Sequence, residues 1–542
     1  MTLAIDRRSL LLTGTFGLGA LAIPGFAQTP AINAARGFTH SVASGEPASD
    51  SMLLWTRYVP ADGGVVELRA EIAESPDFAH VVAGGAQITG PWRDHTAKIT
   101  VAGLMPGRLY HYRFIAPDGT MSPVGRTRTL PEGDTARFRA AIFSCSNMPF
   151  GYFNAYAHAA AAGDFDLTVH LGDYFYEYGG DYYPAADKVV GNRHPAPGNA
   201  VVHLADYRLR YASYRADPDL QRLHQVLPMI VQWDDHESAN DSWEGGAENH
   251  HPATEGDWNP RRAAAIQAYR EWMPVSDEPW KTYDIGTLAT LFRTETRLLA
   301  RTRQADVAPL FKQADPTAAL KAFRDGAWQD PAVTMMGSQQ ENWLTHAMHA
   351  SVRAGQRWQM VGFGTILGQT IMPPAASSWI DPNASERSKN YVLNGIAAGK
   401  LGLPFNYDNW GGYPAARARF LRSSQAVGAN LIVVTGDSHN AWAYDLGQDG
   451  KPAGVEFAGH SVTSPGYESS VHVDPKTVAA ALVAGNPELK WCDTSRRGYM
   501  AVTLTPDRAS CDWVMLDTIT ARTAAAQIGH STSVSLGRNV MA

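Results

Sequence analysis

Four apolar, strand-like segments of this 542-residue chain each end in side chains that can bind metal ions. Residues 138–143 lead into Ser-Cys-Ser-Asn, 166–171 into Gly-Asp-Tyr-Phe-Tyr, 227–233 into Asp-Asp-His-Glu, and 431–435 into Gly-Asp-Ser-His. In α/β sheets, ligands bind at the carboxyl ends of strands, because the loops leaving neighbouring strands converge there. A single end of this kind is usually only a turn or a solvated charge run. Four of them in one chain predict a metal site.

The region that holds these segments, residues 137–520, has the pattern of an α/β domain. Apolar β-branched runs alternate with Ala-rich amphipathic stretches, which is typical of a buried sheet covered by helices. We expect helices at 153–162, 261–272 and 339–353. The segments 180–200 and 370–412, rich in Gly, Pro, Asn and Tyr, are expected to be long loops, and the end of the chain, from 498 to 514, a β-hairpin.

Residues 36–130 have a different pattern, with short alternating strands separated by turn residues. This pattern predicts an N-terminal β-sandwich of the fibronectin type III kind. Residues 104–114 resemble a tyrosine corner that leads into a late strand of such a sandwich. The turn residues 131–134 are expected to link it to the α/β domain.

The first 27 residues are expected to be a signal peptide. Arg7 and Arg8 precede an apolar, Gly-rich run, and small residues follow before Ala27. The arginine pair favours the twin-arginine export machinery, although an ordinary signal peptide with a chance pair is the alternative. Either route predicts a periplasmic or secreted protein. No other stretch reaches 18 consecutive apolar residues, so no transmembrane segment is expected.

Composition excludes several classes of function. Lys and Arg number 46 against 53 Asp and Glu, and the net charge of −7 gives no general attraction for nucleic acid or an anionic membrane. Three cysteines cannot form a disulfide scaffold, and Cys492 and Cys511 are expected to be structural. A large globular enzyme is the remaining interpretation.

The residue types at the four strand ends indicate which ions would bind. The Cys145 thiolate and Tyr176 phenolate are anionic ligands that favour ferric iron (Fe³⁺) over zinc or magnesium, and His439 supplies an imidazole to the same metal. Asp173 is the candidate to bridge neighbouring cations, because a shared carboxylate offsets their repulsion.

Hard oxygen ligands make up the rest of the predicted centre. Asp235, Asn240 and Asp437 suit calcium (Ca²⁺). His236, which lies between two carboxylates in the sequence, is then free to donate a proton to a leaving group.

Longer motifs make the chain resemble the PhoD family of alkaline phosphatases and phosphodiesterases, a branch of the calcineurin-like metallophosphoesterases. The resemblance covers nearly all of the chain after the signal peptide. The motifs that carry it, in order, are SVASGEP (41–47), LWTR (54–57), SCSN (144–147), HLGDYFYEY (170–178), QWDDHESAND (232–241), MGSQQENWL (336–344), WGGYP (410–414) and TGDSH (435–439). The implied catalytic fold is a metallophosphoesterase-type β-sandwich flanked by helices.

The resemblance also implies a site: one ferric iron flanked by two calcium ions. The residues that match the iron ligands are Cys145, Asp173, Tyr176 and His439, and those that match calcium positions are Asp235, Asp437 and, less closely, Asn240. By the same similarity His236 is the acid and Glu237 orients it. The chain departs from the family at Glu295, where Asp is usual, and this puts any role of that position in doubt.

The predicted activity is hydrolysis of phosphomonoesters and phosphodiesters by metal-bound hydroxide or oxide, with His236 protonating the departing alkoxide. One alternative is a phosphodiesterase or phospholipase-like enzyme with little monoesterase activity. Another is a non-catalytic exported binding protein whose metal site is structural, although such a site would not require the free acid His236. A zinc phosphatase with a serine nucleophile has no support, because no matching serine motif is present.

Overall fold

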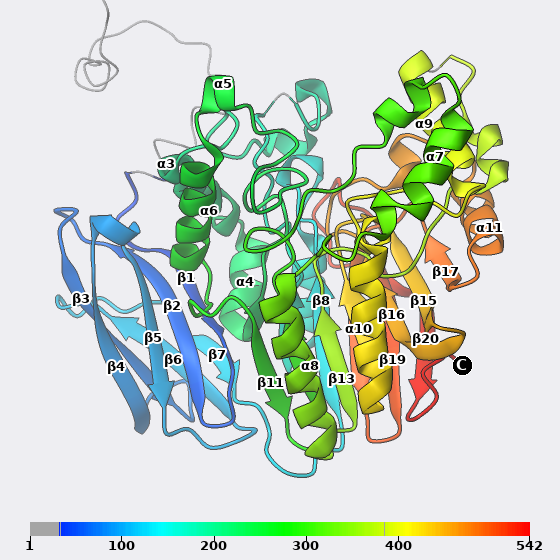
Figure 1. Ribbon diagram of the computed structural model, residues 1–542. Helices are drawn as coiled ribbons and strands as arrows, with labels where there is room; N and C mark the ends of the chain where they lie inside the picture. Colours follow the sequence, from blue (N-terminus) through cyan, green and yellow to red (C-terminus); the bar gives the residue numbers. More distant parts are fainter. Residues whose placement is uncertain (1–31, 33, 181, 384) are drawn as a thin grey trace, which may run out of the picture.

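Three β-sheets and the helices around them make up the computed structural model, which describes residues 32, 34–180, 182–383 and 385–542 (Figure 1). The nine-stranded sheet has the order β20 (Ala526–Ser535), β19 (Arg508–Leu516), β18 (Gly498–Leu504), β8 (Phe138–Phe143), β9 (Leu167–His170), β10 (Met229–Val231), β1 (Gly37–Gly45), β2 (Ser51–Val59) and β5 (Thr96–Ala102). The seven-stranded sheet has the order β11 (Lys281–Ile285), β12 (Ala289–Arg293), β13 (Trp358–Gly362), β14 (Leu431–Thr435), β16 (Lys451–Ala458), β15 (Ala441–Gln448) and β17 (Leu489–Asp493). The four-stranded sheet has the order β4 (Val81–Thr89), β3 (Val66–Ala73), β6 (Leu109–Ile115) and β7 (Gly125–Arg128).

The two larger sheets face each other across one apolar core. Ile142 and Val169, on the neighbouring parallel strands β8 and β9, belong to the same buried cluster as Met360 and Ile432, on the parallel strands β13 and β14. β-branched and aromatic residues suit such strands, which are buried on both faces. The expected α/β sandwich is therefore present, and the hairpin near the end of the chain is its β18–β19 pair.

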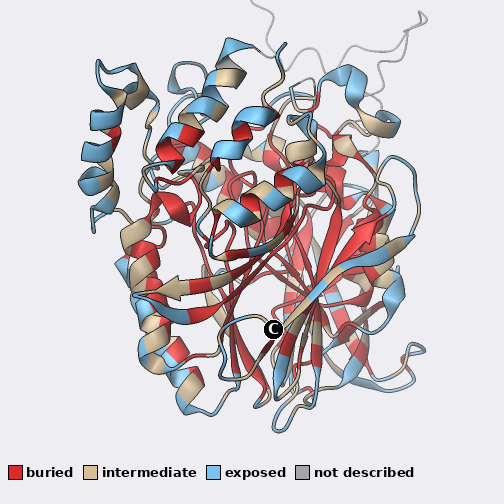
Figure 2. Cartoon of the chain, turned by 90° about the vertical axis from the view of Figure 1, so that its right-hand side faces the viewer, coloured by how far each residue is buried: buried red, intermediate tan, exposed pale blue. Residues whose placement is uncertain are grey.

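Helices cover the outer faces of both sheets. One group packs into the core cluster around β8, β9 and β10: α2 (Asn154–Ala162), α3 (Leu204–Arg215), α4 (Pro218–Val226) and α6 (Trp258–Trp272). A second group packs on the seven-stranded sheet: α8 (Gly337–Arg353), α10 (Pro414–Val427) and α11 (Pro475–Gly485). The three helices predicted from sequence correspond to α2, α6 and α8. Buried residues concentrate in the strands, whereas the outer helices expose one side (Figure 2).

The prediction of an unbroken loop over residues 370–412 is wrong, because this segment contains α9 (Glu386–Gly399). Its Ala398 packs with Leu320 of α7 (Pro316–Asp325) and with Leu403 in a small separate core. Both helices lie together at the upper right of Figure 1. Tertiary burial therefore stabilises a helix in a segment whose Gly, Pro and Asn content had indicated a loop.

The N-terminal strands form the expected sandwich. Leu54 of β2 and Leu68 of β3 share one core cluster, so β1, β2 and β5 pack against the four-stranded sheet. The tyrosine corner is confirmed, because the Tyr110 hydroxyl accepts a hydrogen bond of 2.9 Å from the Met105 amide.

The same sandwich is joined to the α/β domain by a parallel pairing of β1 with β10 at Gly45 and Met229. Only glycine fits at this seam, since a Cβ at Gly45 would lie 2.1 Å from the carbonyl oxygen of Pro274.

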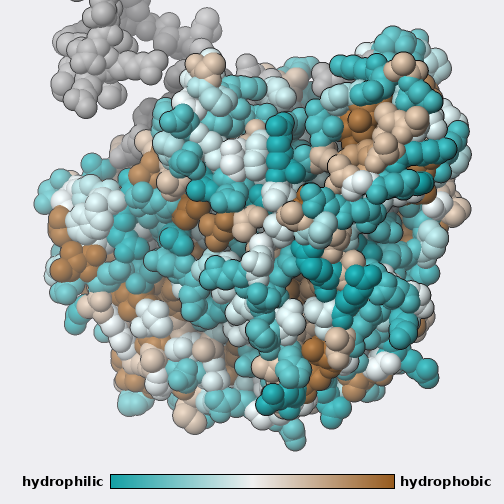
Figure 3. All heavy atoms as spheres, in the orientation of Figure 1, coloured by the Kyte–Doolittle hydropathy of each residue, from teal (hydrophilic) through white to brown (hydrophobic). Residues whose placement is uncertain are grey.

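Three other sequence expectations concern the cysteines, transmembrane segments and the signal peptide. Cys145, Cys492 and Cys511 are all buried free thiols. Among the residues that the structure describes, no helix is long and apolar enough to cross a membrane. The predicted signal peptide, residues 1–27, lies outside the described residues. The face shown in Figure 3 is mostly hydrophilic, with apolar areas scattered among polar residues.

Candidate metal centre

The four strand ends predicted to supply ligands come together, but they belong to two different sheets. Strands β8, β9 and β10 are neighbours in the nine-stranded sheet, whereas β14 lies in the seven-stranded sheet that faces it. The loops after all four strands supply side chains whose ligand atoms approach within 4.8 Å of one another in overlapping groups. The site is therefore built across the two sheets at their carboxyl edges.

Asp173 is the residue that these groups share. The first group joins it to Cys145 and His439, and the second to Asp235 and His236. The third contains Asp173, Asp234, Asp235 and Asp437. Asp173 was predicted to bridge neighbouring cations, and its carboxylate is common to all three groups.

The residues expected to hold iron lie in direct contact. Asp173 Oδ2 is 3.3 Å from Cys145 Sγ and 3.2 Å from the Tyr176 hydroxyl. That hydroxyl is 2.9 Å from His439 Nε2. His439 Nδ1 donates to the carbonyl oxygen of Pro465 at 2.9 Å, which fixes the ring so that Nε2 faces the centre.

Two of the residues expected to hold calcium, Asp235 and Asp437, share a group with Asp173. Asp437 Oδ2 accepts a hydrogen bond of 2.9 Å from the Thr365 hydroxyl, and Asp235 Oδ2 accepts one of 2.7 Å from the Asp241 amide. The Oδ1 atom of Asn240 accepts from the Tyr178 hydroxyl at 2.9 Å. Its Nδ2 atom donates to Glu248 at 2.6 Å, so both polar side-chain atoms of Asn240 contact residues outside the three ligand groups.

The backbone around the ligands has unusual conformations. Cys145, Asp173, Asp437 and His439 have φ angles of 61°, 55°, 63° and 61°, in the left-handed region that non-glycine residues rarely adopt. Such conformations cluster at functional sites, where the surrounding structure holds them in place. Gly172 has a φ of 112°, and a Cβ there would lie 2.4 Å from the Asp234 backbone. Glycine is therefore required directly before Asp173.

The charges of the centre fit bound cations. Asp173 and Asp235 are buried, and each has an Oδ1 atom with no hydrogen-bond partner. Burial raises the pKa of Asp437 to about 7 and that of Asp173 well above its usual range, and neighbouring carboxylates add to both shifts. Burial also raises the pKa of the Cys145 thiol. These buried groups can ionise together only beside compensating positive charge, which metal ions supply.

His236 is held at the centre by Glu177. Its Nδ1 atom donates to Glu177 Oε2 at 2.7 Å, and its Nε2 atom lies 4.0 Å from Asp235 Oδ2. Burial opposes the charged ring, but the carboxylates of Asp235, Glu177 and Asp173 outweigh this effect and raise the pKa of His236 well above its usual range. The ring can therefore carry a proton on the nitrogen that faces the ligand cluster.

The expectation that Glu237 orients His236 needs a correction, because Glu177 makes that contact. The Glu237 carboxylate instead accepts hydrogen bonds from the Asp173 amide at 3.1 Å, from the Asp234 amide at 2.7 Å and from the Tyr174 amide. Glu237 thus fixes the two loops that carry ligands.

Sequence reasoning also missed a buried charge network beneath the ligands. Arg297 is completely buried; its Nε and Nη2 atoms donate to Asp234 at 2.7 and 2.9 Å, and its Nη1 atom donates to Asp408 at 2.6 Å. The Glu295 carboxylate accepts from the Arg297 amide at 2.7 Å and from the Trp233 indole at 2.9 Å. The one signal in the sequence was the Glu-Thr-Arg segment that contains both residues.

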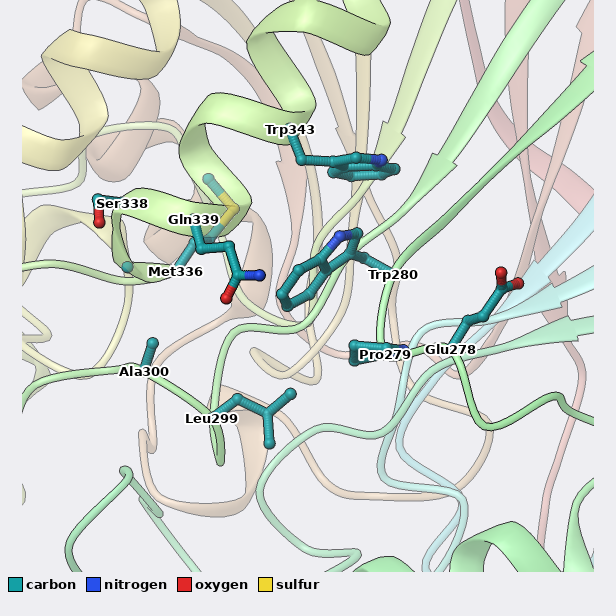
Figure 4. Close-up of a pocket in the computed structure, with 10 residues that line it drawn as sticks. Glu278, Pro279, Trp280, Leu299, Ala300, Met336, Ser338, Gln339 and Trp343 are labelled. Atoms are coloured by element: carbon teal, nitrogen blue, oxygen red, sulfur yellow. The ribbon is translucent and has the colours of Figure 1, made fainter.

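A separate cavity lies away from these ligands. It has a volume of about 740 Å³, and Trp280 and Trp343 form one wall with ring centroids 6.1 Å apart (Figure 4). Its lining includes the start of α8 but none of the candidate ligands. The cavity and the candidate ligands are therefore separate features of the described chain.

Comparison with known proteins gives consistent results along most of the chain. The family model for PhoD-like phosphatases matches residues 140–513, and the one for the N-terminal domain of PhoD-like phosphatases matches residues 25–131. Alkaline phosphatase D of Bacillus subtilis (strain 168) is 31% identical over 544 residues, which cover 95% of this chain and 83% of that protein.

Comparison with solved structures gives the same result as comparison of sequences. The structure of PhoD matches with a TM-score of 0.76 and 28% identity, over 94% of this chain and 92% of that one. Purple acid phosphatase PPD1 from yellow lupin (Lupinus luteus) seeds matches with a TM-score of 0.52 and 13% identity, over 91% of this chain and 73% of that one. The second likeness shows the fold alone, and together they confirm the expected fold class.

Proposed function

Because the chain belongs to the PhoD-like phosphatase family and is a phosphoric ester hydrolase, we propose that it is an exported, metal-dependent enzyme that cleaves phosphomonoesters and phosphodiesters. The observation that carries this proposal is the position of Asp173, whose carboxylate belongs to all three groups of candidate ligands. This arrangement suits several cations held close together around one phosphoryl group.

We propose ferric iron and two calcium ions as the metals. Cys145, Asp173, Tyr176 and His439 would hold the iron, because thiolate, phenolate and imidazole are ligands that favour a transition metal. Asp235, Asp437 and Asn240 would hold calcium through hard oxygen atoms. When bound, such ions polarise phosphoryl oxygens and activate water.

The chain's own residues supply the proton and the positioning. His236 holds its proton on Nε2, since Glu177 occupies Nδ1, and that proton goes to the oxygen of the departing alcohol. Glu237 keeps the loops after β9 and β10 in register through the Asp173 and Asp234 amides. Burial of the cluster excludes bulk water, which strengthens each of these interactions.

Elemental analysis with a visible spectrum tests the proposal. We expect about one iron and two calcium ions per chain, with a charge-transfer absorption band that Cys145→Ala removes. Cys492→Ala is the matched control, because Cys492 is also a buried free thiol but lies outside the centre. Zinc or magnesium in a colourless protein would contradict the assignment of Cys145 and Tyr176.

Export by the twin-arginine machinery is proposed from Arg7 and Arg8 alone. Replacing both with Lys should leave the protein in the cytoplasm, as measured by cell fractionation. Unchanged export of that variant would show that an ordinary signal peptide acts here.

A further inference from the structure

Three tyrosines form a continuous surface that begins beside His236 and ends in solvent. We call Tyr178, Tyr182 and Tyr183 the aromatic strip. The Tyr178 ring lies 5.3 Å from the His236 ring, between centroids, 5.1 Å from Tyr182 and 5.6 Å from Tyr183. Each distance lies within the range of ring contact.

Exposure increases along this surface. His236 is buried, Tyr178 is half-buried and Tyr182 is 74% exposed. Tyr178 is fixed by its hydroxyl, which donates to Asn240, and Tyr183 packs on Phe150 with centroids 4.8 Å apart. Tyr182 buries little of its ring, so its contribution to the stability of the fold is small.

The aromatic strip begins at the place where the proposed hydrolysis puts the leaving group. In the proposed hydrolysis a water oxygen forms the new bond to phosphorus, the bond from phosphorus to the ester oxygen breaks, and the His236 proton goes to that oxygen. The proton that the water loses restores the protonated ring, so that ester and water give alcohol and phosphate. The departing alcohol must therefore lie next to His236. From His236 toward solvent, the rings of Tyr178 and Tyr182 follow one another in contact.

We propose that the aromatic strip binds the leaving group by stacking, and that the substrates are phosphate esters whose alcohol carries a planar ring, of the nucleoside class. This inference rests on the proposed function and adds the substrate class to it. A planar base stacks on tyrosine without a sequence-specific hydrogen bond, and each stacked base contributes measurably to binding. An acyclic alcohol such as glycerol offers no such face.

Release of inorganic phosphate from three monoesters tests the inference. Adenosine 5′-monophosphate carries a planar ring, glycerol 1-phosphate does not, and phosphocholine carries a small cation. We expect kcat/KM for adenosine 5′-monophosphate to exceed that for glycerol 1-phosphate by about tenfold or more, mainly through KM. Tyr182→Ala should lower kcat/KM for adenosine 5′-monophosphate to about the value for glycerol 1-phosphate, whereas Tyr182→Phe should retain the preference.

A second test measures the binding of free adenosine, so its result does not depend on how fast monoesters are hydrolysed. Free adenosine should inhibit hydrolysis of bis(p-nitrophenyl) phosphate by the wild type competitively, and about tenfold less strongly in Tyr182→Ala. Trp92→Ala is the matched control, since Trp92 is also an exposed aromatic residue, 54% exposed, but lies on the N-terminal sandwich.

The possible results separate the two proposals. Equal turnover of all three monoesters, or a preference that survives in Tyr182→Ala, would overturn the inference and leave the hydrolase proposal standing. A preference for phosphocholine that depends on Tyr182 would mean that the strip recognises a cation, and would also overturn it. No hydrolysis of any ester by the metal-loaded protein would refute the proposed function itself.

Discussion

Glu177→Gln tests whether the Glu177 carboxylate keeps His236 protonated and oriented for the proposed proton transfer. Glu177 is completely buried and accepts from His236 Nδ1 at 2.7 Å, from the Asn240 amide at 2.8 Å and from Asn249 Nδ2 at 2.6 Å. Glutamine keeps the size of the side chain and removes its charge. A hydrogen bond to a charged partner is worth about 1.5–3 kcal/mol, so losing the charge should slow the acid-dependent step by about tenfold to a hundredfold.

The assay compares two esters that differ in their need for an acid. An alkyl phosphate requires a proton on its leaving oxygen, whereas p-nitrophenolate leaves without one. We expect Glu177→Gln to reduce kcat for the alkyl ester and to spare the p-nitrophenyl ester. The carboxylate of Glu177 contributes to the raised pKa of His236, so its removal lowers that pKa. Because the acid must be protonated, activity on the alkyl ester should then be lost at a lower pH as the pH rises.

Glu237→Gln is the matched control, since Glu237 is equally buried but binds backbone amides instead of His236. It should reduce the hydrolysis of both esters together, through disturbed loops. An equal loss on both esters in Glu177→Gln would refute the assigned role of Glu177. The same ester-selective loss in Glu237→Gln would restore the original assignment of the orienting carboxylate.

Three further changes test the construction of the centre. Arg297→Met removes a buried cation from the carboxylates of Asp234 and Asp408. It should lower the free energy of unfolding by about 3–5 kcal/mol, measured by urea denaturation. An unchanged free energy of unfolding would show that the fold does not need this ion pairing. Gly172→Ala should lower the thermal midpoint and the metal content together, because its Cβ would overlap Asp234 and its φ is 112°. Removal of bound metal with a chelator should lower the thermal midpoint, and added metal should restore it, because a ligand that binds only the folded state stabilises it.

Several candidate ligands could be predicted from the sequence because they closely follow the ends of their strands. Cys145 comes two residues after the end of β8, and Asp437 two residues after the end of β14, so the local order of the chain already places them at strand ends. The sequence contains no comparable signal for strand pairing between distant segments. That β14 lies in a second sheet, and that β1 joins β10 through Gly45, therefore became visible only in the structure.

Contacts within the loops were less predictable than the ligands themselves. Glu237 is adjacent to His236 in the sequence, but its carboxylate reaches back to the Asp234 amide, so the neighbouring side chains serve different partners. Glu177 lies 59 residues earlier and still holds the ring. A hydrogen-bond partner is selected by geometry in three dimensions, whereas a resemblance between sequences transfers roles only between aligned positions.

The division of the ligands between two sheets links metal binding to the fold. Cys145, Asp173 and Asp235 follow strands of the nine-stranded sheet, whereas Asp437 and His439 follow β14 of the seven-stranded sheet. A cation held by ligands from both sides would connect the sheets at the edge where their apolar core ends. Without it, burial and the neighbouring carboxylates raise the pKa values of Asp173 and Asp437, so these groups are held as neutral acids and no charge joins the two edges. The centre proposed to perform the hydrolysis is therefore also expected to hold the two sheets together at this edge.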